Sequence, residues 1–291
     1  MASIDVSTGM NLEYDVRGEG EPILFVMGLA GQLIDWPEEF VDLFVDEGYQ
    51  VIRFDNRDIG LSTQTNGEPP SQNRVLAAMI RRRALKNVGY TVEDMAADAA
   101  ALLEALGTGP AHVVGASMGG MITQAMAINH PSKVRSICSI MSNTSDKKNG
   151  GVAFSLMAKL GRRPAPTLEN AVDESVVLFR AISGDHFDEE EHRKRSQEGV
   201  SRSFTPAGVA RQTAAIAGSP DRTARLGKVT VPALVVHGLQ DPLVKPSGGI
   251  ATAKAIPGSR LLMFGDMGHD LPRPRWLELR DAILTNIRRA G

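Results

Sequence analysis

The sequence predicts an α/β protein in which helices flank a mostly parallel sheet and a helical cap is inserted. Strand-like and helix-like segments alternate in the first half of the chain and again after residue 221. Such alternation implies a parallel sheet with right-handed crossovers. The length of 291 residues fits one α/β domain with an insertion. We therefore expect a core of residues 1–142 and 222–291 and a cap of residues 143–221.

The predicted strands are short apolar runs. Residues 22–27 form one continuous run, as expected of a strand that is covered on both faces. The other predicted strands are residues 49–54, 112–114, 134–141, 233–237 and 260–264.

The predicted helices follow apolar spacing and end signals. Apolar side chains recur at helical intervals over residues 35–47, and Gly48 ends that segment. Thr91 and Asp94 form an N-terminal capping pattern for a helix over residues 91–106. Further helices are expected at residues 118–129, 249–256 and 276–288 of the core and around residues 154–160, 168–182 and 206–217 of the cap.

Composition argues against several functions. The net charge of −2 gives no electrostatic reason to expect nucleic acid or a membrane as partner, and the basic cluster at residues 81–86 is interpreted as a solvated face or loop. Cys138 is the only cysteine, so no internal disulfide or cysteine-held metal is expected. Residues 1–20 lack the pattern of a signal or transit peptide. We expect a cytoplasmic monomer or homodimer without a cofactor.

The pattern G-x-S-x-G at residues 115–119 contains the candidate nucleophile, Ser117. It lies between a predicted strand and a predicted helix, which is the setting that such a nucleophile requires. A serine on so sharp a turn has a strained backbone, so its neighbours two positions away must lack bulk, and both are glycines. The alternative interpretation is a glycine-rich turn with an inert serine.

A nucleophilic serine needs a base, and His269 is the candidate among six histidines. It lies in a polar, glycine-bearing loop directly after the last predicted strand. Loops at the carboxyl ends of parallel strands gather at one edge of the sheet. The other histidines are interpreted as structural (His112, His130 and His237) or as part of a solvated face of the cap (His186 and His192).

Asp241 is the candidate carboxylate that fixes the tautomer of the base. It follows the predicted strand at residues 233–237 and therefore reaches the same edge of the sheet. Asp146 is a rival for this role, and Asp241 could instead serve only to begin a turn.

Two backbone amides are candidates for stabilising an oxyanion. One is the amide of Met118, which follows the candidate nucleophile. The other is the amide of Leu29, in the glycine-bearing loop after the first apolar strand. The alternative for Leu29 is a strand exit without a role.

These motifs resemble the α/β-hydrolase superfamily over nearly the whole chain. The order Ser117, Asp241, His269 is that of α/β-hydrolases and differs from the chymotrypsin and subtilisin orders. Residues 55–62 look like the family's D-x-R-G-x-G-x-S segment, which we treat as a structural brace, but Asp58 stands where glycine is usual.

The sequence is most similar to the aclacinomycin methylesterase-like branch, because Met-Gly at residues 27–28 replaces the common His-Gly and Trp-Pro follows at residues 36–37. The resemblance implies an α/β-hydrolase fold and ester hydrolysis by a Ser-His-Asp triad, without metal or organic cofactor.

The main hypothesis is a carboxylic-ester hydrolase that forms an acyl-serine intermediate on a small to medium hydrophobic ester. A C–C bond hydrolase, a lactonase or a perhydrolase would use the same triad, and a non-catalytic small-ligand receptor could keep it. Haloalkane dehalogenase and epoxide hydrolase are disfavoured, because they have aspartate at the position of Ser117. Candidate pocket residues of the cap, which could equally pack within it, are Phe154, Leu156, Met157 and Phe179.

Overall fold

The computed structural model describes residues 1–80, 84–160 and 165–291, and in this part of the chain eight strands form one sheet. The strand order is β1-β2-β4-β3-β5-β6-β7-β8. Pairing is antiparallel from β1 to β4 by way of β2 and parallel elsewhere, which confirms the predicted α/β class. The strands are β1 (Ala2–Asp5), β2 (Asn11–Arg17), β3 (Glu21–Val26), β4 (Tyr49–Phe54), β5 (Ala111–Ala116), β6 (Val134–Ile140), β7 (Ala233–Gly238) and β8 (Arg260–Phe264).

Strands β1 and β2 were not predicted from the sequence. They lie at the antiparallel edge of the sheet, and Leu12 is the one fully buried residue in the two strands. An edge strand that is half exposed on both faces needs no apolar run, so the pattern that identified the inner strands is missing here.

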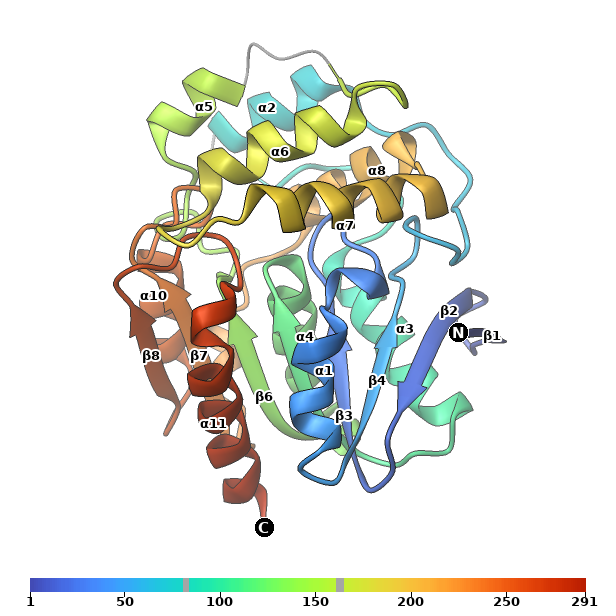
Figure 1. Ribbon diagram of the computed structural model, residues 1–291, viewed down its shortest axis with the longest axis vertical. Coiled ribbons are helices and arrows are strands. Elements are labelled where there is room, and N and C mark those ends of the chain that lie inside the picture. Colours follow the sequence, from blue (N-terminus) through green and yellow to red (C-terminus); the bar gives the residue numbers. More distant parts are fainter. Residues whose placement is uncertain (81–83, 161–164) are drawn as a thin grey trace.

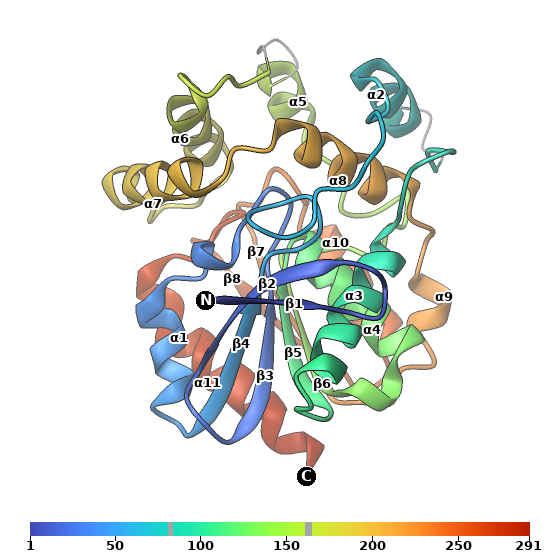
Figure 2. The same cartoon turned by 90° about the vertical axis from the view of Figure 1, so that its right-hand side faces the viewer.

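Helices cover both faces of the sheet. Figure 2 shows α1 and α11 on one face and α3 and α4 on the other. Alternate residues of β3 face opposite sides of the sheet: Ile23 and Phe25 pack in one hydrophobic core, and Leu24 and Val26 pack in the other. The helices of the core are α1 (Glu38–Val45), α3 (Val92–Ala105), α4 (Met118–Asn129), α9 (Thr223–Leu226), α10 (Ser247–Ala255) and α11 (Trp276–Ile287).

The first of these helices begins later than the sequence predicted. Leu33–Asp35 form a short 3-10 turn, and α1 starts at Glu38, after Pro37. A proline disfavours helical backbone in the residue before it, so the continuous apolar spacing from residue 35 does not give a continuous helix.

Four helices, which we call the cap, lie above the sheet (Figure 1). They are α5 (Phe154–Leu160), α6 (Ala171–Ile182), α7 (Glu189–Arg202) and α8 (Pro206–Gly218). Helix α2 (Gln72–Ile80), which comes before the candidate nucleophile in the chain, packs against α8 through Val75 and Ala214. The assignment of residues 143–221 as one inserted domain stays a prediction.

Helices α2 and α7 were not predicted. Helix α7 has no apolar stripe in its sequence, and none of its residues is fully buried. The sequence signal that could have found this helix is its N-terminal capping residue, Asp188, whose side chain accepts a hydrogen bond from the Glu191 amide. Residues 81–83 of the basic cluster lie outside the described residues, and Lys86 is exposed. None of the described helices is long and apolar enough to cross a membrane.

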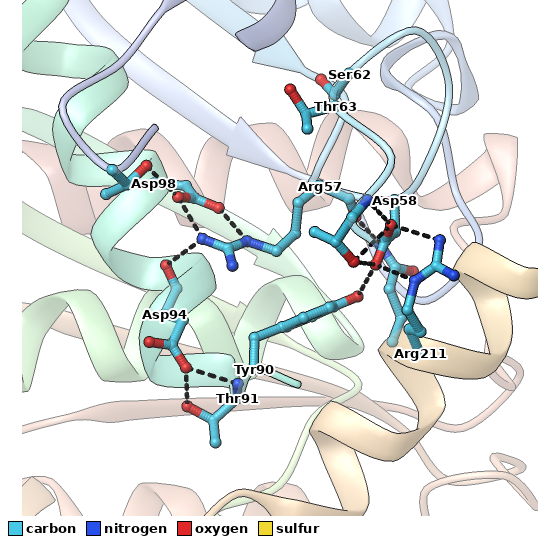
Figure 3. Close-up of polar contacts among 12 residues, drawn as sticks. Arg57, Asp58, Ser62, Thr63, Tyr90, Thr91, Asp94, Asp98 and Arg211 are labelled. Carbon is cyan, nitrogen blue, oxygen red and sulfur yellow. Dashed lines mark hydrogen bonds and ion pairs between the residues drawn. The ribbon is translucent and has the colours of Figure 1, made fainter. Parts of the chain in front are cut away.

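A buried ion pair anchors the loop after β4 to α3 (Figure 3). The Arg57 Nε and Nη2 donate to the two carboxylate oxygens of Asp98 at 2.6 and 2.7 Å, and the guanidinium lies 5.0 Å from the centre of the Tyr90 ring. This arrangement supports the interpretation of residues 55–62 as a brace, since the two parallel bonds fix both partners in one plane.

We expect Arg57→Lys to lower the free energy of unfolding by about 1–3 kcal/mol, because lysine forms neither the paired bonds nor the ring contact. Urea denaturation measures this loss. The matched control is Arg17→Lys, at a partly exposed arginine that pairs with Glu38 and Asp42; there we expect less than about 1 kcal/mol. Equal losses at both positions would contradict the assigned role of the Arg57 pair.

Candidate active site

Ser117 lies in the turn between β5 and α4 with backbone angles φ 56° and ψ −117°. This left-handed conformation is costly for a residue with a side chain. The packing around the turn leaves no room for alternatives, because a Cβ on Gly119 would lie 2.0 Å from the Val26 carbonyl oxygen and one on Gly115 would lie 2.2 Å from the Gly119 carbonyl oxygen. The expectation that both neighbours must lack side chains is thus confirmed.

The structure brings the three predicted triad residues into one hydrogen-bonded chain. His269 Nε2 lies 2.9 Å from Ser117 Oγ, and His269 Nδ1 lies 2.7 Å from Asp241 Oδ2. With Asp241 ionised, Nδ1 carries the proton that binds the carboxylate, which leaves Nε2 free to accept the serine proton.

Asp241 is held by its own turn. Its Oδ1 accepts hydrogen bonds from the amides of Leu243 and Val244 at 2.9 and 2.8 Å. Beneath it, the fully buried His237 donates from Nε2 to the Val244 carbonyl at 2.7 Å and lies 3.4 Å from Asp241 Oδ2. Burial raises the pKa of the Asp241 carboxyl, but the contacts with His237 and His269 outweigh burial, so the pKa lies below its ordinary value.

The rival carboxylate lies in a different environment. Asp146 Oδ1 accepts a hydrogen bond from the Lys148 amide at 2.8 Å, and its other oxygen binds the Asn149 side chain. It makes no contact with His269 among the described residues. The geometry therefore favours Asp241 as the partner of the imidazole.

The cap holds the loop that carries His269. The His269 amide donates to the Ile182 carbonyl at the end of α6 at 2.7 Å, and the Asp185 amide donates to the Asp266 carbonyl at 3.0 Å. A Cβ on Gly268 would lie 2.4 Å from the Ile182 oxygen, so the backbones of the two segments are in direct contact there.

The predicted oxyanion amides lie in segments next to Ser117. A Cβ added to Gly28 would lie 3.1 Å from Ser117 Cβ, which places the loop before Leu29 directly against the serine. Met118 is the first residue of α4, where helical amides have no partner within the helix. No described residue accepts a hydrogen bond from the Leu29 or Met118 amide.

A cavity of about 2050 Å³ opens over Ser117 and His269, between the core and the cap. It exceeds the roughly 300–1,000 Å³ of typical small-molecule sites. Of the four predicted cap residues, Met157 and Phe179 line it. The prediction is wrong for Phe154, whose side chain is exposed, and for Leu156, which is buried within the cap.

His192 of α7 also lines the cavity, so its interpretation as part of a solvated face is wrong. Its ring packs against those of Phe179 and Phe187, at centroid distances of 4.2 and 5.7 Å, and its Nε2 is 3.0 Å from Ser175 Oγ. Burial lowers the pKa of His192 to about 4, and the Arg195 charge acts in the same direction. The polar sequence of α7 gives no sign of this environment, because the aromatic ring and the hydroxyl at 4.2 and 3.0 Å from His192 belong to α6.

Polar cap residues that reach the core, among them Arg202 and Gln212, were not predicted. Arg202 Nη1 donates to Asp55 Oδ2 and to Gln32 Oε1, both at 2.6 Å. Gln212 is fully buried on α8. A buried polar residue in a helix becomes recognisable only when the orientation of that helix is known. Within residues 1–80, 84–160 and 165–291, no group of three or more His, Cys, Asp or Glu side chains could hold a metal ion.

A family model of the alpha/beta hydrolase fold matches residues 21–272. The chain belongs to the α/β-hydrolase family. This membership confirms the resemblance that the motifs indicated, and it agrees with the sheet order and with the position of Ser117 after β5.

Relatives of this α/β-hydrolase include two methylesterases, in agreement with the predicted branch. It is 28% identical to rhodomycin D methylesterase DnrP of Streptomyces peucetius over 92% of this chain and 91% of the relative. It is 29% identical to rhodomycin D methylesterase DauP of Streptomyces sp. strain C5, with the same coverage. The family and these relatives support hydrolase activity.

Solved structures share the fold of this α/β-hydrolase. The enol-lactonase of Burkholderia xenovorans LB400 superposes with a TM-score of 0.74 at 22% identity, covering 99% of this chain and 100% of the other. A thermophilic esterase of Thermogutta terrifontis gives a TM-score of 0.72 at 24% identity, covering 99% and 98%.

Asp35 is a carboxyl group of the cavity wall that lies outside the triad. Its Oδ2 accepts a hydrogen bond from the Gln32 amide at 2.7 Å. Burial raises the pKa of Asp35 to about 6, although the Gln32 amide and the Arg195 charge oppose the rise. The folded state therefore holds the Asp35 proton up to a higher pH than the unfolded state does. The free energy of unfolding falls as the pH rises from about 4 to about 6.

We expect Asp35→Asn to remove this loss, because the amide oxygen still accepts from Gln32 but carries no charge. The free energy of unfolding of the variant should gain about 1–2 kcal/mol on wild type between pH 4 and pH 7. Urea denaturation across this range is the measurement, with Asp46→Asn at an exposed aspartate as the control. Parallel pH curves for wild type and Asp35→Asn would contradict the raised pKa.

Proposed function

We propose that this α/β-hydrolase cleaves carboxylic esters of small molecules through an acyl-serine intermediate. The observation that carries the proposal is the unbroken hydrogen-bonded chain from Ser117 Oγ through His269 to Asp241, at 2.9 and 2.7 Å. Ser117 and His269 line a cavity that can hold a substrate.

In the proposed reaction, Ser117 Oγ attacks the ester carbonyl carbon while His269 Nε2 takes its proton. The carbonyl oxygen becomes an oxyanion, which the Leu29 and Met118 amides stabilise. When the tetrahedral intermediate collapses, the C–O bond to the alcohol breaks, and His269 gives its proton to the leaving oxygen. Water then attacks the acyl-serine with the same base, releasing the acid and restoring the Ser117 hydroxyl. The scheme uses no metal and no organic cofactor.

The choice of an ester rests on similarity. Two relatives bear the name of methylesterases, and they align along nearly the whole chain. The likeness to the enol-lactonase shows the fold alone, so a lactone, like a C–C bond or a peracid, is an alternative for the same triad. The cavity volume leaves room for an ester larger than the small to medium one expected from the sequence.

We expect a fluorophosphonate probe to label the protein once, at Ser117, because this serine lines the cavity and its hydroxyl is bound to a histidine that in turn binds a carboxylate. Ser117→Ala should lose the label and about 10⁴-fold or more of the rate on chromogenic esters. Mass spectrometry and an ester assay measure the two effects. The control is Ser196→Ala, at another serine that lines the cavity.

Three results would contradict either the proposed nucleophile or the proposed reaction. Labelling at another residue would move the nucleophile. Equal, near-background ester rates for folded wild type and Ser117→Ala would favour a non-catalytic receptor. High activity on lactones or vinylogous diketones, with none on esters, would keep the triad but change the reaction.

We expect Asp241→Asn to lower kcat by about 10⁴-fold, because an amide cannot hold the His269 tautomer in which Nε2 is free to accept a proton. Asp146→Asn is the matched control and should keep most of the activity, since the hydrogen bonds of the Asp146 carboxylate to described residues stay within its own loop. Steady-state ester kinetics measure both variants. The reverse ranking would move the acid to Asp146.

A further inference from the structure

Gln212 joins the cap to two loops of the core. Its side chain is fully buried, although it belongs to cap helix α8. Gln212 Oε1 accepts a hydrogen bond from the Ala30 amide at 3.1 Å, and Gln212 Nε2 donates to the Arg57 carbonyl at 2.9 Å. Because one partner is a donor and the other an acceptor, glutamine satisfies both without a charge.

The Ala30 amide belongs to the loop that carries the Leu29 amide. Ala30 has a φ of 65°, a conformation that costs energy for a residue with a Cβ. Elsewhere in this loop the Asn56 side chain donates to the Met27 carbonyl at 3.1 Å, and at its end Arg202 Nη1 donates to Gln32 Oε1 at 2.6 Å. Gln212 therefore fixes the loop on the far side of Leu29 from Met27, next to a strained residue.

The position of Gln212 is set by the residue before it. Arg211 donates from Nε and Nη2 to the two carboxylate oxygens of Asp58 at 2.9 and 2.8 Å (Figure 3). Tyr90 donates to the same carboxylate at 2.7 Å. A Cβ on Gly208 would lie 1.9 Å from the Asp58 carbonyl oxygen, so α8 meets the loop after β4 without a gap.

We propose that Gln212 is a positioning residue for the oxyanion site, and that helix α8, docked by the Arg211–Asp58 pair, lets the cap complete that site. The inference rests on the proposed function, since it takes the Leu29 amide as an oxyanion donor. An oxyanion donor works only if it is held in place before the reaction. Loss of the Ala30 bond frees the Leu29 peptide to move, and a shift of about 1 Å costs about 100-fold in rate.

The test compares Gln212→Met, which removes both hydrogen bonds at similar volume, with Gln212→Glu, which keeps an acceptor for the Ala30 amide. Gln197→Met is the matched control, at an exposed glutamine of cap helix α7. Active sites are counted by burst titration with a fluorophosphonate, so that kcat refers to folded, reactive serine. The affinity of a trifluoromethyl ketone, which forms an oxyanion on the enzyme, is measured beside the KM of a chromogenic ester.

We expect Gln212→Met to lower kcat by about 10–100-fold and to weaken the ketone by a similar factor, with KM within about threefold. Gln212→Glu should stay closer to wild type, and Gln197→Met should equal it. A merely structural role would reduce the titrated sites and leave kcat per site and ketone affinity unchanged. Wild-type values of both for folded Gln212→Met would overturn the proposal.

Arg211→Met decides the question if Gln212→Met does not fold, because it loosens the docking of α8 at a residue near the surface. The proposal requires a lower kcat and a weaker ketone complex at unchanged KM; wild-type values would overturn it. Failure of the proposed function has a different signature: Ser117→Ala would be as active as wild type. If Ser117 is essential and both α8 variants match wild type, only the inference on Gln212 fails.

Discussion

The architecture of the site depends on one strained backbone position, the left-handed Ser117 between β5 and α4. The turn raises the hydroxyl out of the sheet edge, and it exists only because neighbouring backbones approach within the space that a Cβ would need at Gly115 and Gly119. The cost of such a conformation is about 1–3 kcal/mol, and close packing on every side keeps it. His269 and the cavity are arranged around this fixed point.

The cap is joined to three core loops: the loop that carries His269, the loop after β4, and the loop that carries the Leu29 amide. The end of α6 binds the His269 loop through the Ile182 carbonyl, Arg202 of α7 binds Asp55, and Gln212 of α8 binds the Ala30 amide. Two of these contacts involve side chains that are buried or nearly so. A cap held in this way does more than cover the cavity, because a movement of its helices would change the geometry of the core loops.

The structure explains why Asp58 can replace the glycine that is usual at this place in the family pattern. Its φ of 72° explains why glycine is usual at this place in the D-x-R-G-x-G-x-S segment. The aspartate accepts the same strain, yet its buried carboxylate binds Arg211, Tyr90 and Thr65. These hydrogen bonds lower the pKa of Asp58 against the effect of burial, so the side chain is ionised where α8 docks. Glycine would be relaxed here but could not hold the cap.

The sequence by itself determined the parallel core, the inner strands and the candidates Ser117 and His269, because apolar runs and strand-end positions follow from local chemistry. Only the tertiary structure decided what depends on contacts between distant segments. It selected Asp241 over Asp146 as the partner of His269, turned His192 toward the cavity and buried Gln212 against Ala30. Strand β2, next to the edge of the sheet, and the polar helix α7 were not predicted for the same reason, since what stabilises them lies on their neighbours and not in their own periodicity.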